Sequence, residues 1–472
     1  MTVTFSSLDT AGRPIPRGRS VRSTVGFAAT AMLVSYLPFS ATNGALGTIG
    51  AATGAGTSTL QWVTDAFTVA LTGGVLCGGA LAERFGRRRV TIAGLLATVL
   101  GTLTGWLAGG AHGAGAVHVL WIAQAVSGIG GGLVMSATLS LIALTAPSPA
   151  ARTRAIAVWA ACNVVGLGAG PFLAGAIGEA ATWRWMFPPL TALAIATAAF
   201  GEACSREVAP VRGTQTDRSG QLLGTLGLVA LVFGVIRGGS AGWASPLTLA
   251  GLAAGVVLLV AFLLVERRAA APTISPALFA SRGFAAAGLA AAAALFTVIG
   301  IVFVLSIYLA GRGVSDLGIA ERLGCLFAGN ALASVASGPL QTRVGSRPVL
   351  IAALVVAVGG LVALLGADGP QLADLSWRLL IVGAGCGTAV ASSTVVAVQS
   401  ATGPLTAMAG TANNVIRQLG GALGVAVIGA VLAAGLAAGR TPLYAVRTCL
   451  AVLLVVLAAS AVLSGALLAR RS

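Results

Sequence analysis

Long runs of apolar residues, separated by short polar segments, dominate the chain. The runs are continuous rather than alternating, which favours helices over strands, and each is long enough to cross about 30 Å of hydrocarbon. Because the first run is too long for the core of a signal peptide, we predict that it is the first transmembrane helix. Fourteen runs are counted, at residues 25–46, 61–81, 90–111, 117–144, 156–178, 184–200, 220–238, 246–265, 284–309, 322–340, 349–366, 377–399, 408–436 and 445–467.

The composition agrees with a membrane protein. Of the 472 residues, 57% are hydrophobic and only 8% are charged, whereas soluble domains carry about 25% charged residues. This composition excludes an ordinary soluble enzyme and a long disordered protein. The six cysteines are scattered and show no spacing typical of a metal site or a disulfide framework.

The positive charge indicates topology rather than nucleic-acid binding. The net charge is +16, and all 28 basic residues are Arg, placed in short clusters between the apolar runs. If the N-terminus is cytoplasmic, 20 Arg lie inside and 7 outside, with Arg417 inside a span. This bias predicts a multi-pass protein of the cell inner membrane with both termini in the cytoplasm.

An internal repeat divides the chain. Gly79-Ala-Leu-Ala-Glu-Arg-Phe-Gly-Arg and Gly338-Pro-Leu-Gln-Thr-Arg-Val-Gly-Ser-Arg are 259 residues apart, and a fainter pair containing Asn163 and Asn414 is 251 apart. Repeated helical halves are typical of secondary transporters. The predicted organisation is an Arg-rich N-terminus (1–24), a six-helix half (25–200), a linker (201–219), two inserted helices (220–265), a linker (266–283), a second six-helix half (284–467) and a C-terminus (468–472).

Two segments of the chain resemble signatures of the major facilitator superfamily. The stretch from Gly79 to Arg89 is similar to the family's loop between helices 2 and 3, with Glu83 where Asp is usual. The glycine-rich stretch around Pro171 is similar to the family's antiporter motif in helix 5. The resemblance implies a gating loop of Gly79, Glu83, Arg84, Gly86, Arg87 and Arg88, and a helix 5 motif of Gly166, Gly170, Pro171 and Gly175.

Three further segments resemble the fourteen-helix drug:proton antiporter branch of that family: 60–67, 183–187 and 413–421. The resemblance implies an all-α polytopic membrane protein with two six-helix halves and two inserted helices. The sequence differs from this branch at two positions that the resemblance associates with proton coupling. Pro38 stands where the branch usually has an acid in helix 1, and Gln124 stands where it usually has an Arg in helix 4.

Two charged residues inside the spans are candidates for proton coupling. Asp65 lies about four residues into the second run, roughly 6 Å deep, and Arg417 lies about nine residues into the thirteenth, roughly 13 Å deep. Because ionisable groups in spans are usually functional, we predict that Asp65 carries the proton. Arg417 would influence the proton affinity of Asp65 or hold an anionic group. The alternatives are a hydrated interfacial Asp and a structural Arg.

Polar side chains in the spans can line a cavity or bridge helices. The predicted substrate cavity contains Asn43, Trp62, Gln124, Asn330, Asn413 and Asn414. Glu83 is predicted to bind the start of helix 13, near residues 402–411, where the helix dipole favours a carboxylate, and so to lock the cytoplasmic gate. The alternative is a solvated loop charge.

The functional hypotheses follow from these features. The sequence contains no Ser-His-Asp, Walker or zinc arrangement, so we predict no enzyme activity, cofactor or metal. The predicted partners of this monomer are a small-molecule substrate, protons and the lipid bilayer, and not nucleic acid. The first hypothesis is export of lipophilic or cationic molecules against protons. The second, favoured by Pro38 and Gln124, is a proton-independent facilitator or a dedicated natural-product or lipid exporter. The third is a membrane sensor or scaffold.

Overall fold

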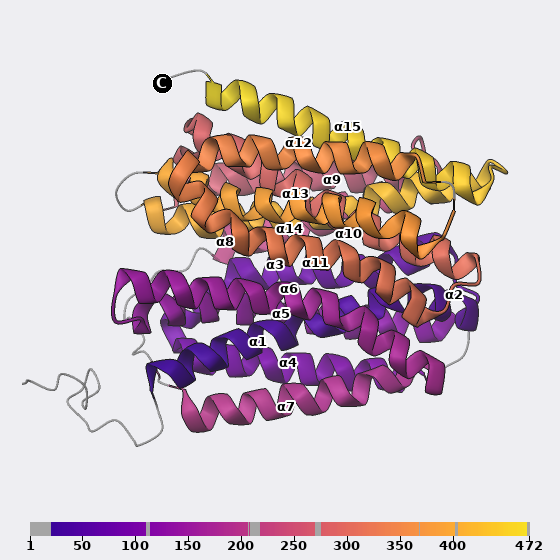
Figure 1. Ribbon diagram of the computed structural model, residues 1–472. Helices are drawn as coiled ribbons and strands as arrows, with labels where there is room; N and C mark the ends of the chain where they lie inside the picture. Colours follow the sequence, from indigo (N-terminus) through magenta and orange to yellow (C-terminus); the bar gives the residue numbers. More distant parts are fainter. Residues whose placement is uncertain are drawn as a thin grey trace, which may run out of the picture.

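The computed structural model describes residues 20–109, 114–205, 207, 218–269, 275–367, 369–401 and 405–469 (Figure 1). The predicted segments 1–24, 201–219, 266–283 and 468–472 therefore lie partly outside the described residues. All secondary structure in the described part of the chain is helical. The helices are α1 (Val21–Gly44), α2 (Leu46–Thr53), α3 (Thr57–Phe85), α4 (Arg87–Ala108), α5 (Ala114–Thr145), α6 (Pro149–Ala180), η1 (Trp183–Met186), α7 (Phe187–Cys204), α8 (Arg218–Ala241), α9 (Pro246–Arg268), η2 (Pro276–Ala280), α10 (Arg282–Gly311), α11 (Asp316–Val344), α12 (Ser346–Leu365), α13 (Leu372–Gln399), α14 (Leu405–Ala437) and α15 (Pro442–Ala469).

Fourteen of these helices in the described chain are long and apolar enough to cross a membrane, which confirms the predicted fold class. Several begin earlier than the apolar run does. Helix α3 begins at Thr57, because the polar residues before its apolar run are also helical, and α14 begins at Leu405, three residues before the predicted run. The short helix α2, which directly follows α1, has no counterpart in the prediction.

The repeat is visible in the backbone. Gly86 ends α3 and precedes α4 with φ +98°, and Gly345 ends α11 and precedes α12 with φ +96°. Residues with a side chain rarely adopt this left-handed conformation, so glycine permits the same sharp connection in both halves. The two glycines are 259 residues apart, as the sequence repeat requires.

Helices α1 to α7 form one half and α10 to α15 form the other, and they lie side by side in Figure 1. The halves meet where α6 packs on α11 and α3 packs on α14. The inserted helices α8 and α9 pack on each other, and α8 also contacts α3 and α14. We call the end of the bundle with the start of α1 and the end of α15 the terminus end, and the opposite end the α2 end.

Candidate functional site

A polar cluster joins the two halves near the middle of the bundle. The Gln418 side-chain amide donates to the Tyr36 hydroxyl at 2.5 Å, and the Asn414 amide lies 3.3 Å from the Met135 sulfur. Arg417 donates to the Asn414 side-chain oxygen at 2.6 Å. Because Tyr36 and Met135 come from the first half and the other three from the second, these five residues, here called the central cluster, form one site shared by both halves.

Arg417 lies deeper than the sequence suggested. It is 12 residues into α14, roughly 18 Å from the start of the helix rather than 13 Å. Within the described residues it forms no ion pair, and its side chain donates to the neutral Asn414. An Arg at this depth costs about 2.5–3.5 kcal/mol to insert, so its place in the central cluster, between the halves, is consistent with a functional role.

Asp65 is also deeper than expected. Helix α3 begins at Thr57, which places Asp65 roughly 12 Å from the start of the helix rather than 6 Å. Its side chain is 0% exposed, and neither carboxyl oxygen has a well-formed hydrogen bond among the described residues, the neighbouring Thr68 hydroxyl being the polar group that interacts with the carboxyl. Full burial argues against the hydrated interfacial Asp. Asp65 and Arg417 lie on packed helices, but they form no ion pair in the described structure.

Polar residues beside Asp65 tie α3 to its neighbours. Thr64 donates to the side-chain oxygen of Asn43 at 2.9 Å, and Asn43 in turn donates to the Phe39 carbonyl. Gln61, one turn before Asp65, donates to the Ala426 carbonyl of α14 at 3.1 Å. Asp65 therefore directly follows a residue that contacts α1 and lies one turn beyond a residue that contacts the other half.

The two departures from the resembled branch touch each other. The Gln124 side-chain amide of α5 donates to the Pro38 carbonyl of α1 at 3.2 Å, and Gln124 is 2% exposed. The Gln124 side-chain oxygen has no hydrogen-bond partner among the described residues. A neutral hydrogen bond thus stands where the resemblance implies an acid and an Arg.

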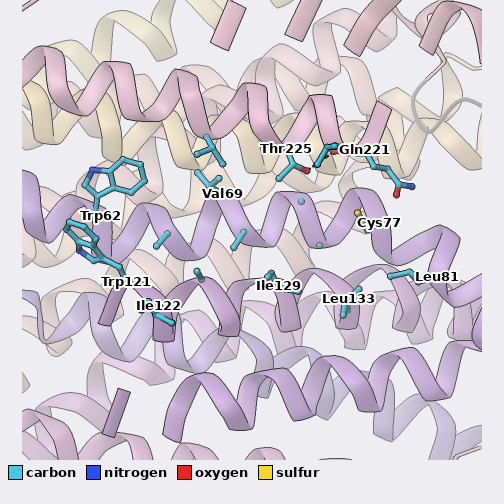
Figure 2. Close-up of a pocket in the computed structure, with 17 residues that line it drawn as sticks. Trp62, Val69, Cys77, Leu81, Trp121, Ile122, Ile129, Leu133, Gln221 and Thr225 are labelled. Atoms are coloured by element: carbon cyan, nitrogen blue, oxygen red, sulfur yellow. Dashed lines mark hydrogen bonds between the residues drawn. The ribbon is translucent and has the colours of Figure 1, made fainter. Parts of the chain in front are cut away.

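The other predicted cavity residues lie elsewhere. Asn413 is buried and donates weakly to Thr394 at 3.5 Å, within the second half. The backbone of Asn330 faces Gly387 of α13, also within that half. Trp62 points away from the central cluster: its ring lies 6.1 Å from Trp121 and lines a groove between α3, α5 and α8 (Figure 2).

The predicted helix 5 motif lies in α6, the fifth span. It packs this helix against α1 of its own half and against α11 of the other half. A Cβ on Gly166 would lie 2.5 Å from the Leu33 carbonyl oxygen of α1, and a Cβ on Gly170 would lie still closer to the Ser40 hydroxyl oxygen. Pro171 faces Gly44. Farther along α6, a Cβ on Gly175 would lie 2.7 Å from Leu317 of α11. Small residues here let three backbones approach closely.

The predicted gating loop is anchored within the first half. Arg88 pairs with Glu202 at 3.4 Å and with Glu207 at 3.5 Å, and its backbone N–H donates to Glu207. Arg87 is also buried. These contacts fasten the start of α4 to the end of α7, around the positive φ of Gly86.

The remaining loop residues are more open. A Cβ on Gly79 would meet nothing within 4 Å, and Arg84 lies over the Phe85 ring at 5.1 Å. Glu83 is half-buried. Its predicted partner segment, 402–411, lies partly outside the described residues.

A contact at the α2 end was not predicted from the sequence. The Thr48 hydroxyl donates to the Asp316 carboxylate at 2.5 Å, which joins α2 to the start of α11. Asp316 also faces Gly178 of α6. Tyr36, Met135 and Gln418 of the central cluster were not predicted either, although Gln418 lies beside Arg417 in the segment 413–421 that resembles the antiporter branch.

Comparison with known proteins agrees with this architecture. The family model described as Major Facilitator Superfamily matches residues 28–425. The puromycin resistance protein pur8 of Streptomyces alboniger is 31% identical over 409 residues, covering 85% of this chain and 80% of its own. The cephamycin export protein CmcT of Amycolatopsis lactamdurans is 32% identical over 410 residues, covering 83% and 81%.

A solved structure supports the fold. The crystal structure of a bacterial homolog to the human lysosomal transporter Spinster, in an inward-facing and occupied conformation, aligns with a TM-score of 0.66 at 16% identity. The alignment covers 95% of this chain and 96% of that one.

Proposed function

Because the chain belongs to the major facilitator superfamily and is therefore a membrane transporter rather than an enzyme, we propose that it exports lipophilic small molecules in exchange for protons. The names of its relatives, a puromycin resistance protein and a cephamycin export protein, support antibiotic-like substrates. Both termini would be cytoplasmic, in the cell inner membrane, as the Arg distribution predicts.

The burial of the Asp65 carboxyl group inside a span is the observation that carries the proposal. A buried carboxylate without a well-formed hydrogen bond is costly in an apolar medium, and binding of a proton removes the charge. In the proposal, Asp65 takes up a proton on one side of the membrane and releases it on the other. Its neighbour Gln61 reaches the second half, so the state of Asp65 is linked to contact between the halves.

The central cluster is proposed to bind the substrate. Tyr36 and Met135 offer an aromatic ring and a polarisable sulfur to a lipophilic molecule. Asn414, Arg417 and Gln418 would orient its polar groups. Asn43, Gln124, Asn330, Asn413 and Trp62 would act outside this cluster, by holding helices together or by lining other surfaces.

Alternating access would follow from the contacts between the halves. Thr48 with Asp316 and Gly175 with Leu317 hold the halves together at the α2 end. In the opposite state these contacts would break, and the halves would close at the terminus end. There Glu83 would bind the start of α14, while Arg88 keeps α4 and α7 together as one body.

A second function is favoured by the contact between Gln124 and Pro38. This neutral pair offers no proton site where the resembled branch has charged groups. The protein would then be a proton-independent facilitator or a dedicated natural-product exporter.

The two functions are separated by efflux of a fluorescent lipophilic cation from cells, with and without a protonophore. The proposal predicts that wild type and Asp374→Asn, a control at the start of α13 where a half-buried carboxylate pairs with Arg378, lose efflux only when the protonophore is added. Asp65→Asn should be inactive in both conditions. Efflux that needs neither Asp65 nor the gradient would instead support the facilitator.

A further inference from the structure

A groove of about 770 Å³ runs between α3, α5 and the inserted helix α8 (Figure 2). Its volume lies within the usual range for ligand sites, about 300–1,000 Å³. The lining is apolar except for Gln221 and Thr225 near the terminus end. Ile122 and Leu222 at its rim are 59% and 61% exposed. The groove therefore opens sideways, toward the bilayer, and not toward the central cluster.

Small residues create the groove. Ala66, Ala70 and Ala125 line it where larger side chains would fill it. A Cβ on Gly73 would lie 2.8 Å from a Thr225 methyl carbon, so glycine lets α8 approach α3 beside it. Along α3 the groove extends from Trp62 to Leu81, roughly 28 Å. This length exceeds one leaflet, about half of a 30 Å hydrocarbon core, so an acyl chain fits along it.

A polar pocket adjoins the groove at the α2 end. The indoles of Trp62 and Trp121 line both, and the small pocket of about 170 Å³ also contains Ser58, Thr59 and Arg237. None of the residues that line this described pocket is acidic. Indoles favour the interface between hydrocarbon and water, so this end of the groove has the polarity of a headgroup region.

We propose that the groove and this pocket together hold one anionic phospholipid. Its acyl chain lies along α3, α5 and α8, and its phosphate binds at Arg237. A guanidinium recognises phosphate through paired N–H donors, and the hydroxyls of Ser58 and Thr59 add further donors. The lipid fills the space between the first half and the inserted helix α8, which gives this inserted helix a binding role of its own.

The test uses the purified full-length protein in nanodiscs that contain phosphatidylglycerol and phosphatidylethanolamine, with retained lipid counted by native mass spectrometry. Wild type should retain one phosphatidylglycerol in preference to phosphatidylethanolamine. Arg237→Gln should lower that preference about fivefold, since one Arg near a membrane surface contributes roughly that much binding of an anionic lipid. Arg237→Lys should keep most of it. Ala70→Trp, which fills the groove, should lose both lipids.

Matched controls keep the result specific. Arg440→Gln removes an exposed Arg at the same end, and Ala192→Trp adds an indole on the exposed face of α7. Both should retain lipid as wild type does. Equal retention of the two lipids by wild type overturns the proposal. Unchanged retention in both Arg237→Gln and Ala70→Trp, or equal loss in the controls, also overturns it.

Discussion

Single side chains connect the halves of this transporter. The Tyr36 hydroxyl accepts the Gln418 amide, and both groups are buried. A buried amide that loses its acceptor costs about 1–3 kcal/mol, so this one hydroxyl has a measurable influence on the central cluster.

Tyr36→Phe should therefore raise the KM for transport about fivefold, because Gln418 loses its partner in the proposed substrate site. The fold should be retained, with a loss of about 1–3 kcal/mol in stability, since the ring still packs edge-on to Phe67. The measurement is substrate-dependent efflux in membrane vesicles, with Tyr444→Phe as the exposed control. An equal KM in the two variants would show that Tyr36 does not belong to the substrate site.

Charged residues in spans could be predicted from the sequence, but their partners could not. Asp65 and Arg417 stand out because charges are rare in apolar runs. Tyr36, Met135 and Gln418 do not, because every face of these helices is apolar and periodicity cannot separate a cavity face from a lipid face. The depth of Asp65 was underestimated because α3 begins in polar residues before the apolar run.

At the scale of the element, close helix packing depends on glycines. The helix 5 motif was identified from its resemblance, and the structure gives its physical reason, which is contact of α6 with α1 and α11. The sequence could not show that one motif faces both halves.

Gly166→Ala should destabilise the protein by about 1–3 kcal/mol, because the added methyl group would press on the Leu33 carbonyl of the α1 backbone. Gly26→Ala is the matched control, since a Cβ there meets nothing within 4 Å. The control should stabilise α1 slightly through helix propensity. Thermal unfolding in detergent measures both, and equal midpoints would contradict the close contact of α6 with α1.

The repeated connections permit a paired prediction. Gly86→Ala and Gly345→Ala both force a side chain into positive φ, which costs about 1–2 kcal/mol. Gly86→Ala should cost more, because its Cβ would also lie 2.9 Å from the Glu207 carboxylate, whereas at Gly345 the nearest atom is 3.7 Å away. Unfolding midpoints in the reverse order would show that the Glu207 contact is unimportant.

At the scale of the molecule, the helical class and the number of spans followed from the apolar runs, and the family resemblance implied two six-helix halves with two inserted helices. The contacts between the halves did not, because they join residues far apart in the sequence. Thr48 and Asp316 are 268 residues apart and resemble ordinary loop residues. Only the packing of α2 and α11 brings them together.

Thr48→Val should weaken closure of the α2 end, because a hydrogen bond to a carboxylate contributes about 1.5–3 kcal/mol. A cysteine at Leu317, in a background without the native cysteines, should then react at least tenfold faster with a maleimide. Thr441→Val, at an exposed position of the same end, should leave the rate unchanged. An unchanged rate in Thr48→Val would show that this contact does not hold the α2 end closed.

The most direct measurement of the central claim is substrate-driven proton movement in proteoliposomes that contain the purified protein. The account predicts that adding a lipophilic substrate moves protons in wild type and in Asp374→Asn. Asp65→Asn should still bind substrate but move no protons. Proton movement in Asp65→Asn at the wild-type rate, or transport without proton movement in wild type, would contradict proton exchange at Asp65.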